Sequence, residues 1–486
     1  MVTETSGLSL PPALLNNDPG GFAWGVWHDR TPRLIAQIRD AHLYGPGQRA
    51  ALDALGREVS AGHISSLPAA APDVALWASW AGGNVGKRWA DAPYLWSESY
   101  FYRRLLQAVD FFTPGPWYFT DPFAYLKNAE LTTAAVAVSL AELPGEDGQP
   151  KLLAALWGNR ADLGFRIDHT GEPARAGLVH DDSAALWAAL EVPGDVIVVT
   201  DNAGQELLAD LIFADHLLAA GHARSVRLHV KPYPWFVSDA TAADVASCID
   251  RLTRGAAGAG AAGDAGAGAA VADTGAGVGA AASSAAGAAV ADRLRAAASA
   301  GRFGLDTHEF YCAPLPFHEM PADLTARYRA ASLTIFKGDL NYRRLTGDRA
   351  WPPDTPFADV VSYFPGPLAA LRTLKSDVIV GLTATAVADL NAASPGWRTD
   401  GSHALIQVLA ARLRVARLRP RPPALRGPVV HEAQKRGVRG PRAPYGLALR
   451  VPRTPTGLRS PAGRPGPRSA RWPPPGRRRR CRSARR

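Results

Sequence analysis

The chain has 486 residues, 47% of them hydrophobic, which is enough apolar material for a large core spread over two or three domains. Its three cysteines, Cys248, Cys312 and Cys481, are too few and too scattered for a disulfide framework, and no CxxC pair indicates a structural zinc site. The start of the chain lacks a basic segment followed by an apolar one, and no run of about 18 apolar residues occurs. We therefore expect neither a signal peptide nor a membrane span, and a cytoplasmic location.

The net charge of +10 comes from the carboxyl-terminal tail, because the rest of the chain is acidic. Residues 413–486 hold 22 of the 54 Lys and Arg residues and a single acid, Glu432, which leaves 32 basic against 43 acidic residues elsewhere. A segment rich in Arg and Pro and poor in aliphatic residues is typical of disorder. The tail either binds nucleic acid, with a nuclear location as one consequence, or has no selected role. We expect no membrane partner, and nucleic acid only if this tail is functional.

The first part of the chain has helical spacing. After a flexible amino terminus, residues 1–19, apolar residues recur every three or four positions, with few β-branched runs. Examples are "RTPRLIAQIRDAHLYG" and "SESYFYRRLLQAVDFF". Residues 20–165 are therefore predicted to form a helical domain.

The next part, residues 166–412, alternates short strands with helices and predicts an α/β domain with a largely parallel sheet. An Ala/Gly-rich insertion, residues 255–292, interrupts it between two stretches of helical spacing and is expected to be a flexible surface excursion. The predicted strands are residues 195–200, 225–230, 332–337 and 378–382.

Polar side chains follow three of these strands. The first strand ends at Asp201 and Asn202, Asp239 follows the second, and the third runs into Lys337, Asp339, Asn341 and Arg343. Ligands bind beyond the carboxyl ends of strands in such sheets. Asp201, Asn202 and Asp239 form a set of hard oxygen ligands suited to Mg²⁺ or Mn²⁺. Arg343 and Lys375 are cations that could neutralise a phosphate group.

Simpler structural interpretations remain open for each residue. Asn202 with Gln205 fits a helix-capping pair, and Asp239 could cap the following helix. The "KGDLNYRR" stretch could be an ordinary polar loop with Tyr342 turned inward. Cys248 and Cys312 are most simply core thiols, and His229 is more often a hydrogen-bonded strand residue than a ligand.

Several longer motifs carry a resemblance to a known family. They cover most of residues 20–410 in the same order and are far more specific than a lone glycine pattern. On these motifs the chain resembles the damage-control phosphatase family, formerly a domain of unknown function, and within it the acidic-residue methyltransferase-like branch. The motifs are "FAWGVWHDRTPRLIAQI", "PYLWSESYFYRRL", "LWGNRADL", "TDNAGQELLADLIFADHLL", "KPYPWFVSDAT", "LTIFKGDLNYRRLTGDRAW", "RTLKSDVIVGL" and "PGWRTDGSHALIQ".

The resemblance implies a helical amino-terminal domain beside a three-layer α/β/α Rossmann-like domain. It also implies a divalent metal, Mn²⁺ before Co²⁺, Ni²⁺ or Mg²⁺, that is used to hydrolyse phosphate esters such as fructose 1-phosphate and fructose 6-phosphate. By motif, the metal ligands are Asp201, Asn202 and Asp239, and the catalytic residues are Asp201, Asn202 and Lys375. The implied contacts to the phosphosubstrate are Asp201, Asn202, Asp339, Leu340, Asn341, Tyr342, Arg343 and Lys375.

The mechanism expected from these residues is electrostatic. The metal and the helix-start amides after Asn202 would hold the phosphoryl oxygens, while Lys375 and Arg343 offset developing charge. Asp201 could attack phosphorus or orient a water molecule, and the sequence leaves both open. The alternative activity is methylation of protein carboxylates with S-adenosylmethionine, although no glycine-rich loop follows the first strong strand. A second alternative is a non-enzymatic nucleic-acid binder acting through the tail.

Overall fold

A computed structural model describes residues 9–131, 147–158, 177–254 and 274–410. The basic tail and the first eight residues of the predicted flexible amino terminus, residues 1–19, lie outside the described residues. The rest of this terminus is held in place, since Ala13 and Leu15 form isolated bridges with Arg349 and Pro93. None of the described helices is both long enough and apolar enough to cross a bilayer.

The described α/β part is built on one sheet of seven strands, in the order β1-β7-β6-β5-β2-β3-β4. β7 runs antiparallel to β6, and the other pairings are parallel. The predicted, largely parallel sheet is confirmed. The strands are β1 Leu178–Asp181, β2 Gly194–Val199, β3 Ala223–Val230, β4 Phe303–Thr307, β5 Leu333–Lys337, β6 Leu368–Thr373 and β7 Ala404–Leu409.

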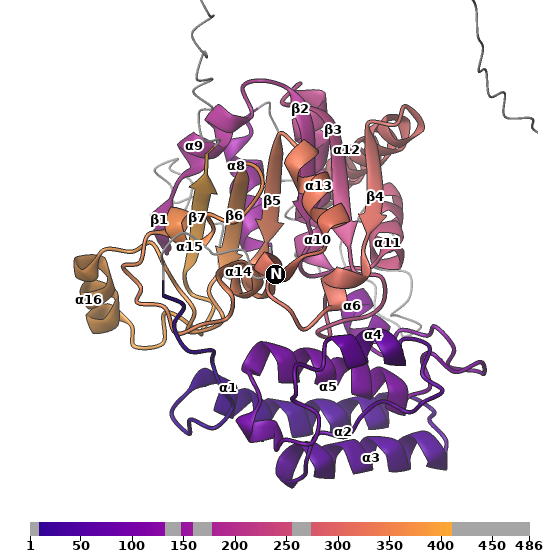
Figure 1. Ribbon diagram of the computed structural model, residues 1–486. Coiled ribbons are helices and arrows are strands. Elements are labelled where there is room, and N and C mark those ends of the chain that lie inside the picture. The colour runs from indigo at the N-terminus through magenta and orange to yellow at the C-terminus, as the bar shows by residue number, and fades with distance from the viewer. Residues whose placement is uncertain (1–8, 132–146, 159–176, 255–273, 411–486) are drawn as a thin grey trace, which may run out of the picture. The chain divides into compact units, whose positions relative to one another are not determined.

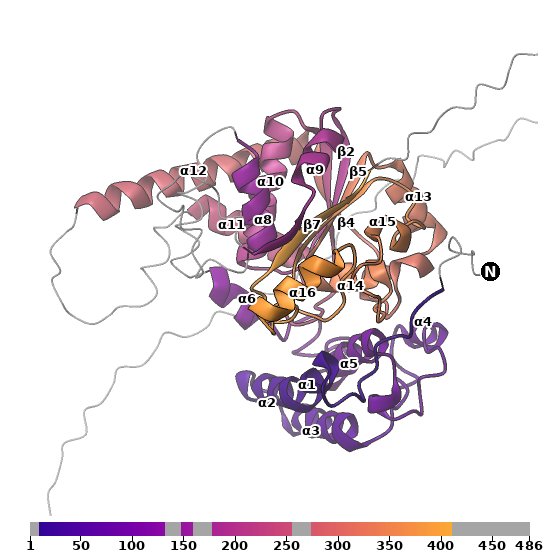
Figure 2. The ribbon, with the colours of Figure 1, turned by 90° about the vertical axis from the view of Figure 1, so that its left-hand side faces the viewer.

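Helices cover both faces of the sheet, because the central strands are apolar on both sides. Val196 and Val198 of β2 point into one hydrophobic core, whereas Ile197 and Val199 point into another. Figure 2 shows the sheet between the two helical layers. This confirms the expected three-layer α/β/α fold. One layer holds α8 Gln149–Trp157, α9 Ser183–Ala189, α10 Gln205–Ala219, α11 Ala242–Arg254 and α12 Thr274–Ser299, and the other holds α13 Ala322–Ala330, α14 Gly338–Thr346 and α15 Phe357–Val360.

The amino-terminal part is helical, as predicted, and has its own aromatic-rich core (Figure 1). The central helix is α5, in which most side chains are buried. Trp235, Cys312 and Leu340 of the α/β part complete this core, so the two parts share apolar contacts. The helices are α1 Phe22–Gly25, the π-helix η1 Val26–Arg30, α2 Thr31–Ala41, α3 Pro46–Ala61, α4 Val74–Ser79, the 3₁₀ turn η2 Trp89–Asp91, α5 Tyr94–Ala108 and α6 Ala124–Leu131.

The strand predicted at residues 378–382 is wrong. Val378, Val380 and their neighbours are buried but irregular, and β6, ten residues earlier, takes the place in the sheet. A side chain, and not a neighbouring strand, forms a hydrogen bond with the backbone here, since Gln407 Nε2 donates to Val380 O at 2.8 Å. The short helix α16, Ala384–Ala393, follows.

The Ala/Gly-rich insertion is also more ordered than expected. Its second half forms the start of α12, and Val290 and Ala291 are buried in the core on the α10 side. Alanine has the highest helix propensity and tolerates interspersed glycine at about 1 kcal/mol each. The helix α8 lies within residues 20–165, which were predicted to form the helical domain. It packs instead on α10 and belongs to a helical layer of the α/β domain.

Candidate active site

The predicted site residues lie at the point where the strand order reverses. From β2 the chain continues to β3 and β4 on one side, then returns to β5 on the other side. β2 and β5 pair in parallel from Val196 with Leu333 to Val199 with Phe336, so their carboxyl ends are neighbours. Open α/β sheets bind ligands in the crevice beyond such a switch point.

The structure brings Asp201, Asn202 and Asp239 together. Asn202 and Asp239 form an isolated antiparallel bridge, and the Ala240 amide donates to Asp201 O at 2.8 Å. The exposed fractions are 6% for Asp201, 8% for Asn202 and 3% for Asp239. The residues thus converge as the sequence suggested, while their role as metal ligands stays a prediction.

The side chain of Asn202 is held from both ends. Its Nδ2 donates to Asp201 Oδ2 and to Glu206 Oε2, both at 2.8 Å, and its Oδ1 accepts from Ser238 Oγ at 2.5 Å. The capping interpretation is wrong for Asn202, since α10 is capped by Gly204 without a side-chain bond.

Asp239 is not a helix cap either. The residues around the start of α11 are Thr241 and Asp244, which bond each other reciprocally: the Thr241 amide donates to Asp244 Oδ2 at 2.8 Å and the Asp244 amide donates to Thr241 Oγ1 at 3.4 Å. Asp239 is therefore available for another role at the strand ends.

Negative charge is concentrated in this buried space. Burial, followed by the charges of Glu206 and Asp239, raises the pKa of Asp201 well above its usual value, and Lys375 and Lys231 oppose the shift. Burial also raises the pKa of Asp239, against Lys231, whose Nζ lies 3.1 Å from Asp239 Oδ2. Burial penalises the charged forms of both carboxylates, and a bound cation would offset that penalty.

A buried ion-pair group supports Asn202 from behind. Lys337 Nζ lies 2.9 Å from Asp210 Oδ1 and 3.2 Å from Glu206 Oε1, and it donates to Ala155 O at 2.6 Å. Burial would lower the pKa of Lys337, but the charges of Asp210 and Glu206 outweigh it and raise the pKa. The chain Lys337–Glu206–Asn202 therefore links the end of β5 to the end of β2.

Asp339 organises the segment that carries Lys375. Its Oδ1 accepts from the Lys375 amide and from Ser376 Oγ, both at 3.1 Å, and pairs with Arg372 at 2.7 Å. Burial would raise the pKa of Asp339, but Arg372 and then Arg343 outweigh it and lower the pKa. The Lys375 ammonium forms no hydrogen bond or ion pair with the part of the chain that the structure describes.

The next three predicted substrate contacts have side chains that face inward. Leu340 packs in the helical core, and Asn341 Nδ2 donates to Thr200 O at 3.1 Å. Tyr342 is turned inward, as one interpretation of the sequence held, and its hydroxyl donates to Gln407 Oε1 at 2.9 Å. A ligand at this point of the chain would therefore meet the backbone at the start of α14, not these side chains.

Arg343 is not the free cation that the sequence suggested. Its guanidinium is bidentate to Asp348, at 2.7 and 3.0 Å, donates to Glu98 Oε2 at 2.9 Å and lies over the Tyr94 ring. Contact with a phosphate would require it to release one of these carboxylates. Whether it does so stays a prediction.

Sequence reasoning missed several residues of the site. Glu206 and Lys231 were assigned no role. Lys231 directly follows β3 and Lys337 ends β5, so a lysine at the carboxyl end of a strand was the signal that could have identified Lys231. Glu98, 245 positions from Arg343, has no local signal. Within the described residues, no three His, Cys, Asp or Glu side chains form a metal cage, and the predicted set combines two carboxylates with an amide.

The other minor expectations are confirmed. Cys248 and Cys312 are buried free thiols, and the ring of His229 is hydrogen-bonded through Nδ1 to the Tyr311 hydroxyl. Neither cysteine contributes to the strand-end site.

Comparison with known proteins gives a consistent result. The damage-control phosphatase ARMT1-like domain matches residues 26–390. The chain is 28% identical over 470 residues to damage-control phosphatase ARMT1 of Danio rerio, covering 83% of this chain and 98% of that protein. It is 28% identical over 462 residues to the Homo sapiens protein of the same name, covering 82% and 98%. A solved DUF89 family protein from Pyrococcus horikoshii aligns with a TM-score of 0.39 at 14% identity, over 72% of this chain and 90% of that one.

Proposed function

Since the chain belongs to the ARMT1-like damage-control phosphatase family, and is thereby a phosphatase of the metabolite-repair type, we propose that it hydrolyses phosphate monoesters at the carboxyl ends of β2 and β5. Sugar phosphates of the fructose 1-phosphate and fructose 6-phosphate class are the proposed substrates, in line with the family resemblance. The proposed cofactor is a divalent metal, Mn²⁺ before Co²⁺, Ni²⁺ or Mg²⁺.

One observation supports this function above the others: the Lys375 ammonium has no hydrogen-bond or ion-pair partner among the described residues. Its charge acts on the buried Asp201, which lies beside Asp239. The two carboxylates could bind a metal, and the neighbouring Lys375 could bind an anion. This arrangement fits a metal and a phosphate bound side by side. It fits S-adenosylmethionine less well, because this donor carries no phosphate and its sulfonium and ammonium groups would add positive charge near Lys375.

The residues present fit a hard divalent metal. Asp201, Asn202 and Asp239 would hold it, and the buried Asp239 Oδ2 already lies 3.1 Å from a cation, Lys231 Nζ. When bound, the metal would supply charge stabilisation at the phosphoryl oxygens.

The rest of the site would act on the substrate by positioning. The amides at the start of α14, held against Asp201 by Gly338, would bind phosphoryl oxygens, and Lys375 would neutralise charge on the leaving side. Asp201 would either attack phosphorus or accept the proton of the attacking water. The buried position of Asp201 and Asp239 would keep bulk water away from the reacting groups.

The experiment that tests the proposal is a panel of sugar phosphates assayed with added metals, using the wild type, Asp201→Ala and Asp239→Asn. Both variants should lose turnover and metal affinity together, since each removes a charged oxygen from the buried pair. Asp195→Asn is the matched control: Asp195 lies at the other end of the same strand and pairs with Arg224. Full activity after exhaustive chelation, or unchanged hydrolysis by Asp201→Ala, would overturn the proposal.

A further inference from the structure

The loop that carries Asp239, residues 232–239, has a strained backbone. Phe236 and Val237 have φ +46° and +69°, in the left-handed region that bulky and β-branched residues rarely adopt. The Ser238 amide donates to Phe236 O at 2.8 Å, which closes a γ-turn around Val237. A γ-turn with a central φ of about +75° is rare and strained. Contacts from elsewhere in the molecule must therefore hold the loop in this conformation.

The helical part holds the middle of this loop through aromatic packing. Trp235 is buried in the core of the helical part, and the ring of Phe236 stacks on the ring of Tyr102 in α5, with centroids 4.8 Å apart. Tyr233 makes an edge contact with Phe112, at 5.4 Å between the centroids. The aromatic side chains of the loop are thus fixed by residues distant in sequence, while the backbone between them takes the unfavourable φ values.

Lys127 of α6 holds the end of the loop at Asp239. The ammonium is buried and donates to three acceptors, which are Asp121 Oδ2 at 3.0 Å, Asp239 O at 3.0 Å and Asp244 Oδ2 at 2.9 Å. An ammonium has three donors, so all of them are used here. The bond to Asp239 reaches its backbone carbonyl and leaves the carboxylate to Lys231. Lys127 therefore fixes the position of Asp239 without occupying its side chain.

We propose that Tyr102 and Lys127 are positioning residues that keep Asp239 at the strand ends by holding its loop in the strained conformation. Without their contacts the loop would relax to ordinary φ values, and the Asp239 carboxylate would move relative to Asp201. The site is then preformed only while the helical part contacts the loop. The consequence for metal binding rests on the proposed function, whereas the restraint on the loop does not.

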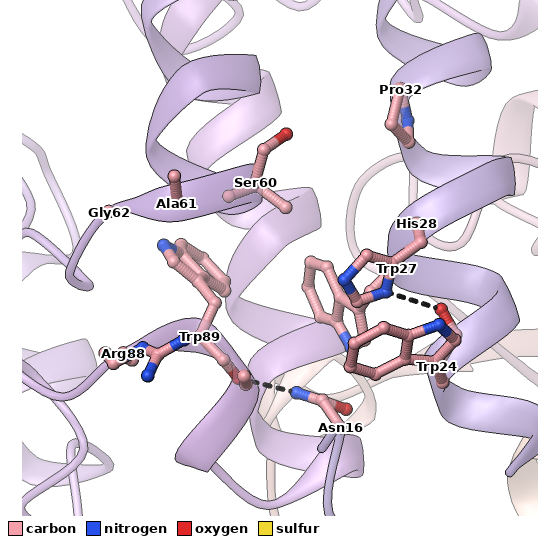
Figure 3. A pocket seen from close by; sticks show the side chains of 12 residues that line it. Asn16, Trp24, Trp27, His28, Pro32, Ser60, Ala61, Gly62, Arg88 and Trp89 are labelled. Carbon is pink, nitrogen blue, oxygen red and sulfur yellow. Dashed lines mark hydrogen bonds between the residues drawn. The ribbon is translucent and has the colours of Figure 1, made fainter. Parts of the chain in front are cut away.

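A pocket elsewhere in the helical part provides a control. It has a volume of about 130 Å³ and lies between η1, the end of α3 and the segment around η2, with Trp89 on one side and Trp24 beside His28 on the other (Figure 3). Its described lining residues include none of the side chains that contact the loop in the pairs above. Val59 lines the pocket and is buried, so Val59→Ala should loosen the helical core without touching the loop.

The test combines hydrogen–deuterium exchange of residues 232–241 in the metal-free, full-length protein with Mn²⁺ affinity from isothermal titration. Lys127→Met keeps the length of the side chain and removes its three hydrogen bonds. It should speed exchange of the hydrogen-bonded Asp239 and Ala240 amides and weaken Mn²⁺ binding, each about tenfold or more. Tyr102→Leu removes the stacked ring and should act in the same direction, while Val59→Ala should change neither measurement.

Relief of the strain should rescue these variants, which would not happen if they merely loosened the core. Glycine adopts φ +69° without a Cβ penalty, so Val237→Gly added to Lys127→Met should restore slow exchange and Mn²⁺ affinity by about fivefold. Val237→Ala loses the same side-chain packing but keeps the Cβ, and should restore much less. The difference between the two substitutions therefore isolates the backbone strain.

Three outcomes would overturn the inference. They are wild-type exchange of residues 232–241 in both Lys127→Met and Tyr102→Leu, the same faster exchange in Val59→Ala, and equal rescue by glycine and alanine at position 237. Two separate contacts are tested, so a variant that does not fold leaves the other to decide. Absence of Mn²⁺ binding by the wild type would contradict the proposed function instead, and the exchange data, which need no metal, would still decide whether the helical part holds the loop.

Discussion

Gly338 lies so close to Asp201 that a Cβ at position 338 would be 1.8 Å from Asp201 Oδ2. The backbone there also has φ +83°, which side chains rarely adopt. The start of α14 is thus pressed against the carboxylate that ends β2, and a glycine is required for this contact.

Gly338→Ala should therefore displace Asp201 and lower turnover by about a hundredfold or more, because a shift of about 1 Å at a reacting group has that effect. The measurement is kcat/KM for the best phosphate ester, together with the thermal midpoint. Gly221→Ala is the matched control, since Gly221 has φ +78° and a Cβ added there would meet nothing within 4 Å. It should cost about 1–2 kcal/mol of stability and leave turnover intact. Equal turnover in both variants would contradict the role of the close contact.

Glu206→Gln should weaken metal binding. Glu206 is one of the charges that raise the pKa of Asp201, and it fixes the Asn202 amide through a 2.8 Å bond. Loss of this buried charge should lower metal affinity about ten- to hundredfold, measured by isothermal titration with Mn²⁺. Asp215→Asn removes a charge from the same helix, where Asp215 pairs with Arg293, and should keep wild-type affinity. A loss of the same size in both variants would mean that α10 as a whole was disturbed.

Lys375→Ala should impair catalysis without impairing folding. The ammonium has no partner in the described chain, so its removal leaves no buried group unpaired. If it contacts the phosphate, kcat/KM should fall about ten- to hundredfold, and Lys375→Arg should recover part of the loss. Arg372→Ala serves as the comparison. It would remove a fully buried hydrogen-bond partner of Asp339 and Ser376 and should lower the free energy of unfolding. Undiminished kcat/KM in Lys375→Ala would remove Lys375 from the site.

The parts of the fold that the sequence predicted are those with a local signal. β2 and β5 are buried runs rich in β-branched residues, and the polar residues after them had to meet because parallel strands share an edge. β6, "LAALRT", has the composition of a helix, so only its place between β5 and β7 makes it a strand. The apolar run at 378–382 had the stronger strand signal but no neighbour to pair with.

The site shows the same division. Asp201, Asn202 and Asp239 could be found from strand ends, whereas the commitment of Arg343 to Glu98 could not, because it depends on a contact between the helical part and α14. The role of Glu206 likewise depends on Lys337, 131 positions away. The tertiary structure determines which groups a buried charge pairs with, and a single sequence does not show these pairs.

The last prediction concerns acid stability and a group away from the site, His229 in β3. Burial, with smaller contributions from Arg327 and His308, lowers the pKa of His229 from 6.5 to about 4, against the opposing charge of Asp306. The unfolded chain therefore binds a proton between pH 6.5 and about 4 that the folded chain excludes. The stabilisation is fully present above pH 6.5 and is lost as the pH falls through this window, by up to about 3 kcal/mol.

The free energy of unfolding, measured by urea titration at several pH values, should fall less steeply in His229→Gln than in the wild type. His63→Gln changes an exposed ring and serves as the control. Parallel curves for wild type and His229→Gln would show that the ring titrates alike in the folded and unfolded chains, since only a difference in proton binding between the two states gives a slope.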